Sequence, residues 1–248
     1  GTMWLMTDHG LFRSTNPQAP EPVFETIVDR DMAWSSGAYR DSDGTLWLGL
    51  GDELFEIKES KFTNRGSVGI RFPDNLITGI TRDRDGRLLV SDIANLMEYQ
   101  PAANPDANGI FTRIFSVPKG TSLGDVVTTD DGIVWLGTDK GLFRRTGDRR
   151  AEFAALGNAN ATSIRGLSTD RSGNLWISIQ NNGVRLLKTE SLINFIPKPG
   201  DNKAVGDVIE DSRGRLWAAL GDFSTAVLDK NELIVRDLHE ALPANPSV

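Results

Sequence analysis

The sequence contains no cysteine, only two histidines, His9 and His239, and no apolar run long enough to cross a bilayer. The missing cysteines exclude disulfides, thiolate nucleophiles and cysteine-based metal sites. Two histidines are too few for a histidine-rich zinc site, and no triad arrangement around them is evident. Because a membrane-spanning helix needs about 20 apolar residues, we expect no direct membrane insertion by this segment. No stretch has the features of a signal peptide, although the first residues already lie inside a repeat.

The composition is that of an ordinary globular protein. The 248 residues are 39% hydrophobic and 25% charged, which is enough for one domain with a sizeable core. The formal net charge is −7, so a general attraction to nucleic acid or to anionic membranes is not expected. The 25 glycines and 11 prolines suit a chain with many turns.

One short motif recurs along the whole chain. Its clearest copy is Asp170–Ile179, in which an aspartate is followed by a glycine and then by Leu-Trp. In every copy a glycine stands three residues before one fixed position, and five of the six tryptophans occupy that position. A period of about 40 residues indicates a repeat architecture. The fixed position falls at Trp4, Trp47, Leu89, Trp135, Trp176 and Trp217, with spacings of 43, 42, 46, 41 and 41 residues.

Each repeat predicts four short β-strands. Around Trp176, apolar and β-branched runs at 164–167, 175–179, 184–187 and 193–196 are separated by turn residues, which is typical of strands joined by hairpins. No long segment has helical apolar spacing. A single four-stranded unit cannot bury both faces, but units stacked around an axis can. We therefore predict an all-β fold, a single β-propeller domain over residues 1–248, with about six four-stranded blades or as part of a seven-bladed ring.

The Asp-x-x-Gly part of the motif has a structural explanation. Glycine allows the positive φ of a tight turn, and the carboxylate can accept backbone N–H groups across it. The tryptophan is then expected to fill the gap to the neighbouring blade. The copy before Trp135 has Thr129 in place of the aspartate, and Asp130 is expected to substitute for it. The outer strands of the first and second blades are predicted at 23–28 and 68–72.

The two ends of the chain fall at neighbouring points of the repeat. Residues Asn245–Val248 align with Asn202–Val205, where an innermost strand is expected to begin. The first blade is therefore expected to start at its second strand. An unclosed ring would leave exposed strand edges, so we expect flanking sequence beyond this segment.

The repeat, written Ile-x-x-Ile-x-x-Asp-x-x-Gly-x-Leu-Trp-Ile-Gly-Thr-x-x-Gly-Leu, resembles the two-component regulator propeller repeat. The best copy is Asp130–Phe143, with Trp-Leu-Gly-Thr-Asp-Lys-Gly-Leu-Phe, followed by Trp4–Phe12, with Trp-Leu-Met-Thr-Asp-His-Gly-Leu-Phe. The resemblance covers essentially the whole chain, and the blade with Leu89 departs from it. It implies a sensor segment on the periplasmic or extracellular side of a bacterial membrane protein, whose kinase or other output domain lies outside this sequence. In gut-bacterial members of that family the ligands are often glycans.

Candidate ligand-binding residues lie in two sets of loops at one end of the expected channel. One set leads into the innermost strands, the other joins second to third strands, and pockets concentrate where such loops converge. Polar side chains with one aromatic platform suit a sugar-like ligand, and Trp34 is singled out because it lies outside the repeated position. Packing beside the small residues that follow it is the alternative role of Trp34. The candidates are Trp34, His9, Asp31, Asp52, Asn75, Asp92, Asp139, Lys140, Asn181, Asn182, Lys203 and Asp222.

No cofactor and no metal site is predicted. Residues 41–44 and 83–86 have the Asp-x-Asp-Gly start of a calcium loop, but the late bidentate glutamate is not found at the required spacing. His9 could face the channel and is the one candidate general base, while His239 is expected at the surface.

The sequence thus predicts a ligand-sensing segment that is not itself an enzyme and that binds a small molecule or a glycan. Two alternatives stay open. The repeats also resemble, more distantly, the propeller lyases that inactivate streptogramin antibiotics with histidine, glutamate and a metal, and the chain could instead be a protein-binding scaffold. Nucleic acid is not an expected partner, and a homodimer formed through flanking domains is left open.

Overall fold

The computed structural model describes residues 3–7, 9–19, 21–29, 35–59, 61–69, 76–104, 107–145, 153–155, 163–180, 183–188, 191–195, 205–211, 213–220, 225–229 and 232–236. All the regular secondary structure assigned in these residues is β-strand. No helix in this part of the chain is long and apolar enough to cross a membrane.

Within the described residues the strands form six antiparallel sheets, and each sheet is built from consecutive strands. The first sheet contains β1 (Met3–Thr7), β2 (Gly10–Ser14) and β3 (Glu25–Asp29), and the second contains β4 (Ser35–Arg40), β5 (Leu46–Leu50), β6 (Glu53–Lys58) and β7 (Lys61–Ser67). The third contains β8 (Ile77–Arg82), β9 (Leu88–Asp92), β10 (Asn95–Gln100) and β11 (Ile110–Ser116), and the fourth contains β12 (Leu123–Thr128), β13 (Val134–Thr138), β14 (Gly141–Arg145) and β15 (Phe153–Ala155). The fifth contains β16 (Ile164–Thr169), β17 (Leu175–Ile179), β18 (Val184–Lys188) and β19 (Ser191–Phe195), and the sixth contains β20 (Val205–Glu210), β21 (Leu216–Leu220), β22 (Thr225–Asp229) and β23 (Glu232–Arg236).

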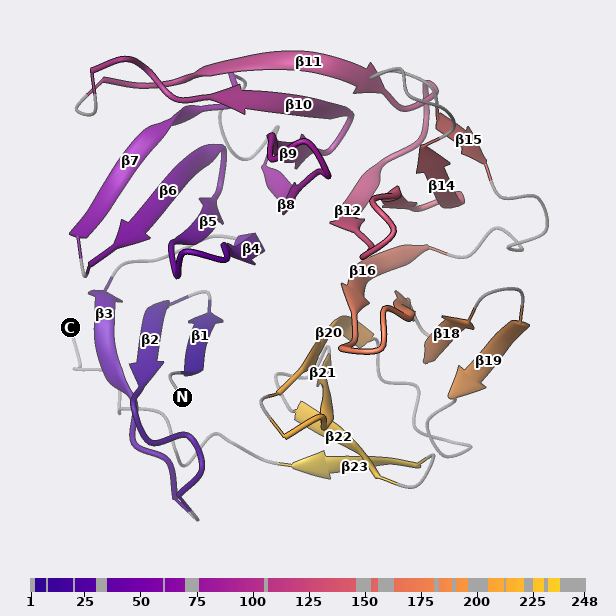
Figure 1. Cartoon of the computed structure of the whole chain (residues 1–248). Helices are drawn as coiled ribbons and strands as arrows, with labels where there is room; N and C mark the ends of the chain where they lie inside the picture. Colours follow the sequence, from indigo (N-terminus) through magenta and orange to yellow (C-terminus); the bar gives the residue numbers. More distant parts are fainter. Residues whose placement is uncertain are drawn as a thin grey trace.

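The sheets stand around a common axis, with β4, β8, β12, β16 and β20 nearest to it and the last strand of each sheet at the periphery (Figure 1). The first sheet begins with the strand that carries Trp4, as expected from its place in the repeat. This arrangement confirms the predicted all-β fold of propeller type.

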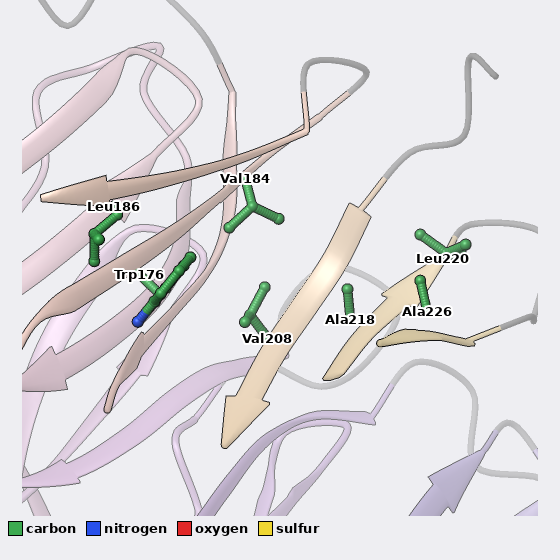
Figure 2. Close-up of a cluster of buried hydrophobic side chains, with 7 residues drawn as sticks. All are labelled: Trp176, Val184, Leu186, Val208, Ala218, Leu220 and Ala226. Carbon is green, nitrogen blue, oxygen red and sulfur yellow. The ribbon is translucent and has the colours of Figure 1, made fainter. Parts of the chain in front are cut away.

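Apolar clusters between consecutive sheets hold the ring together. In one of them Trp176, Val184 and Leu186 of the fifth sheet face Val208 and Ala218 of the sixth (Figure 2). Four further clusters lie between the first and second, second and third, third and fourth, and fourth and fifth sheets. The repeated tryptophan therefore packs against the following blade, as predicted, and a fully buried large side chain stabilises the fold by roughly 1.5–3 kcal/mol.

The Asp-x-x-Gly turn also holds the tryptophan through a hydrogen bond to its indole N–H. The Asp170 Oδ1 atom accepts the backbone N–H groups of Ser172 and Asn174, at 2.9 and 3.0 Å. The Trp176 Nε1–H donates to Asp170 Oδ2 at 2.8 Å, and Gly173 has a φ of 75°. A side-chain bond from the turn to the indole was not part of the sequence prediction, and it explains why the aspartate and the tryptophan occur together.

Two expectations from the sequence are wrong. Before Trp135, Thr129 itself replaces the aspartate, because its Oγ1 accepts the indole N–H at 3.2 Å and donates to Asp131 Oδ1 at 2.5 Å. Asp130, the expected substitute, is exposed. A threonine hydroxyl can accept one hydrogen bond and donate another, so Thr129 links the Trp135 indole to the Asp131 carboxylate.

The outer strand of the second blade is the other error. It is β7 at Lys61–Ser67 rather than 68–72. Lys58 pairs directly with Lys61, and Glu59 in this tight turn has a φ of 50°. An outer strand is mostly exposed, so β7 has a polar sequence with Phe62 stacked on Phe55, ring centroids 4.6 Å apart, as its main apolar contact. That pattern carries little of the alternation that identifies a strand.

Candidate functional site

The turns between second and third strands lie at one end of the ring, and two of them share one sequence and one geometry. In Thr138–Gly141 the Thr138 hydroxyl donates to the Gly141 carbonyl at 2.7 Å and accepts the Lys140 N–H at 3.1 Å. In Thr7–Gly10 the Thr7 hydroxyl accepts the His9 N–H at 3.1 Å. The Thr-Asp-x-Gly sequence thus forms a hydroxyl-braced turn that places Lys140 and His9 at equivalent tips.

These turns are hydrogen-bonded to the segments that lead into the innermost strands. Asp139 and Ser122 exchange two bonds, from Ser122 N–H to Asp139 Oδ1 at 2.8 Å and from Asp139 N–H to the Ser122 carbonyl at 3.0 Å. The Ile93 carbonyl accepts the Leu123 N–H at 2.7 Å across two sheets. The two loop sets are therefore hydrogen-bonded to each other where the structure describes them.

Five of the candidate residues can be placed. Lys140 is exposed, and its Nζ lies 3.8 Å from Asp139 Oδ2, while His9 is exposed at the first turn. Asp52 Oδ2 accepts the Ser67 hydroxyl at 2.6 Å. Asp92 is buried and accepts the N–H groups of Ala94 and Asn95, at 2.7 and 2.6 Å. Asp92 thus closes its own turn, and Lys140, Asp139, His9 and Asp52 are the members with the more open positions.

The other candidates lie outside the described residues. They are Trp34, Asp31, Asn75, Asn181, Asn182, Lys203 and Asp222. Their role as ligand-binding residues stays a prediction.

A groove of about 190 Å³ lies at the opposite end, where the first and second sheets meet. It is lined by Trp4, Arg13, Arg40 and Glu59 among others. The Arg13 guanidinium lies over the Trp4 ring, 5.6 Å from its centroid, and its Nε donates to Glu25 at 2.5 Å. None of these residues is among the sequence candidates.

Two carboxylates on the innermost strands were missed by the sequence reading. Asp125 of β12 and Asp207 of β20 occupy the same position of their strands, where β8 and β16 have Gly79 and Gly166. The sequence marks this position, because each of the five inner strands has a glycine or an aspartate two residues after its first residue. The spacing does not show which groups the two carboxylates contact.

No group of three or more His, Cys, Asp or Glu side chains that could hold a metal ion occurs in the described part of the chain. The aspartates of residues 41–44 and 83–86 are bonded by arginine or lysine side chains and by backbone N–H groups. Asp41 Oδ2 accepts the Arg82 Nε–H at 2.8 Å, and Asp83 Oδ2 accepts the Arg87 Nε–H at 2.8 Å.

Comparison with known proteins shows the class of fold. No protein-family model matches the sequence, and no curated protein matches it either. Among solved structures, virginiamycin B lyase from Staphylococcus aureus has a TM-score of 0.68 at 14% identity, covering 96% of this chain and 81% of the lyase. A protein named as a gluconolactonase has a TM-score of 0.63 at 17% identity, covering 92% and 87%.

The extracellular domain of a hybrid two-component system from B. thetaiotaomicron is similar as well. Its TM-score is 0.65 at 20% identity, and the match covers 91% of this chain and 31% of that domain. The chain thus spans about a third of that domain. Identities this low show the fold alone, so the protein is a β-propeller, and the similar structures include both the extracellular domain of a two-component system and proteins named as enzymes.

Proposed function

We propose that this chain is the ligand-sensing propeller segment of a bacterial membrane-bound two-component regulator. It would lie on the periplasmic or extracellular side and bind a small molecule or an oligosaccharide. The support is twofold. The motif Trp-Leu-x-Thr-Asp-x-Gly-Leu-Phe occurs at Trp4–Phe12 and Trp135–Phe143 and includes the same hydroxyl-braced turn in both sheets. The extracellular domain of a hybrid two-component system shares the fold over 91% of this chain.

The end of the ring that carries the turns at 7–10, 51–52, 92–95 and 138–141 is the proposed ligand site. Its single strongest feature is the pair of bonds between Asp139 and Ser122, which joins the two loop sets while Lys140 stays exposed. A site preorganised in this way loses little entropy on binding. Lysine and aspartate side chains next to each other can donate to and accept from sugar hydroxyls.

Thermal unfolding in the presence of a panel of neutral and acidic oligosaccharides tests the proposal. A ligand at a hundredfold excess over its Kd should raise the free energy of unfolding by about 2.7 kcal/mol. Lys140→Ala should weaken that shift, and His9→Ala should weaken it if the ligand reaches the first turn. Arg40→Ala, in the groove at the opposite end, is the matched control and should leave the shift unchanged.

The outcomes separate the alternatives. Loss of the shift with Arg40→Ala and not with Lys140→Ala would move the site to the opposite end and contradict the proposal. Consumption of a bound compound, abolished by His9→Ala, would instead favour the enzyme, since His9 is the candidate base. A protein partner that stabilises the chain when no oligosaccharide does would favour the scaffold.

A further inference from the structure

Asp125 and Asp207 replace glycine at one position of the innermost strands. The five innermost strands have Gly37, Gly79, Asp125, Gly166 and Asp207 there, each at a shift in the pairing register with the second strand. Going round the axis from the third sheet to the sixth, glycine and aspartate therefore alternate. β16, which carries Gly166, contacts both β12 and β20, and Figure 1 shows it between them.

The glycines make the space that the carboxylates use. A Cβ on Gly79 would lie 2.6 Å from the Val126 backbone nitrogen and would also meet Asp125 Oδ1. A Cβ on Gly166 would lie 2.8 Å from Asp207 Oδ1. Real Cβ atoms do not approach neighbours this closely, so each aspartate fits because the preceding inner strand has no side chain at that point.

Asp125 connects two neighbouring blades by hydrogen bonds. Its Oδ1 accepts the N–H of Val126 in its own strand, and its Oδ2 accepts the N–H of Leu167 in β16, both at 2.7 Å. Asp207 Oδ1 accepts the N–H of Val208, also at 2.7 Å. Because Leu167 follows Gly166, the two carboxylates lie on either side of the same short stretch of β16, and their negative charges repel each other.

No cation in the described residues pairs with either carboxylate. On β16, the Arg165 guanidinium donates to Gln180 Oε1, at 3.1 and 2.7 Å. On β8, Arg82 is bonded to Asp41. The Arg171 Nε atom lies 3.8 Å from Glu210 Oε1 of β20. A proton is therefore the simplest means of relieving the repulsion.

We propose that Asp125 and Asp207 form a proton-binding pair on the ring axis, and that uptake of a proton tightens the packing of the inner strands of the fourth, fifth and sixth blades. This inference concerns the ring itself and does not depend on the proposed ligand.

The direction of titration follows from the surroundings. Burial, and then the charge of Asp207, raise the pKa of Asp125 well above its usual range, and burial raises the pKa of Asp207 to about 6. Asp207 is nevertheless exposed to water at the axis, which moderates the effect of burial, so we expect Asp207 to titrate below Asp125. Both folded-state pKa values lie above the unfolded value of about 3.9. The contribution to stability is therefore fully present below about pH 4 and is lost as pH rises through about 6.

Urea unfolding between pH 4.5 and 8.5 tests the pair. In the wild type, the equilibrium constant for unfolding should increase from pH 4.5 through about pH 6, by up to about tenfold per pH unit for one proton. Asp207→Asn is nearly isosteric and carries no charge, so it should flatten this dependence. Asp29→Asn, an exposed aspartate at the end of β3, is the matched control and should keep the wild-type slope.

Amide hydrogen exchange at Leu167 gives a second readout, because its N–H is the donor to Asp125. Its protection, relative to Ile80 on β8, should fall as pH rises through the same window in the wild type and not in Asp207→Asn. The proposal is overturned if the pH profiles of wild type and Asp207→Asn are parallel, that is, if the variant changes stability equally at every pH. This result would mean that the carboxylate only fills space.

Discussion

The smallest unit that maintains this fold is one aspartate and the indole six residues after it. Burial opposes ionisation of Asp170, but hydrogen bonds from Asn174, Trp176 and the turn backbone outweigh it and lower its pKa. In the sixth blade the same balance lowers the pKa of Asp211 to about 2. The carboxylate stays charged in the native protein, and bonds to a charged acceptor are the stronger ones.

Asp170→Ala removes the acceptor and leaves the indole N–H of Trp176 and two backbone N–H groups without it. We expect the free energy of unfolding in urea to fall by about 2 kcal/mol. Asp130→Ala, an exposed aspartate in the preceding blade's turn, is the control and should change it by less than about 0.5 kcal/mol. Equal losses in both variants would show that the indole bond contributes nothing specific.

In the second and third blades the aspartate is not bonded to an indole, and single residues explain why. Leu89 offers no indole N–H, and Asp83 is instead bonded by Arg87, with Arg145 of the fourth blade 3.6 Å away. The second blade has the tryptophan of the motif, Trp47, but its aspartate, Asp41, accepts from Arg82 instead. The Trp47 Nε1 atom is buried without a partner. At Asp41 and Asp83 an arginine therefore binds the carboxylate in place of an indole, whereas Asp211 accepts from both Arg215 and the Trp217 indole. The motif alone does not reveal this difference.

At the scale of the element, the inner strands depend on glycines that a neighbouring strand approaches. Gly79→Ala would bring its Cβ to 2.6 Å from the Val126 nitrogen, so the third and fourth blades would have to separate. We expect a loss of about 2 to 3 kcal/mol in the free energy of unfolding. Gly206→Ala, also on an inner strand, meets nothing closer than 3.8 Å and should be tolerated. The same urea titration measures both variants, and a tolerated Gly79→Ala would contradict the close approach.

Element by element, the part of the fold that the sequence could predict is the part under strong local constraint. The second strands follow the Gly-x-x-Trp spacing, and β17 has the predicted bounds, Leu175–Ile179. The outer strand β7 was misplaced because exposure removes the apolar pattern. Asp125 was missed for a different reason. Its importance comes from Gly79 and Leu167, which lie 46 and 42 residues away in the sequence, and no local pattern encodes such a contact.

At the scale of the whole molecule, the contacts between neighbouring sheets, here called joints, differ in chemical character. Five consecutive joints carry an apolar cluster. Between the sixth and first sheets, the described contact is polar, a bond from Arg213 to Gln18. In a repeat structure, stability is approximately a sum over units and joints. The sixth sheet should therefore depend mainly on its cluster with the fifth.

Trp176→Ala tests this dependence, because Trp176 belongs to the cluster that joins the fifth and sixth sheets. Native-state hydrogen exchange should show protection lost in β21 and β22 by about 3 to 5 kcal/mol, while β9 keeps its wild-type protection. Trp47→Ala, at the joint of the second and third sheets, is the matched control and should spare β21 and β22. If Trp176→Ala lowered protection equally in all sheets, the ring would unfold as one cooperative unit, and its joints would not act separately.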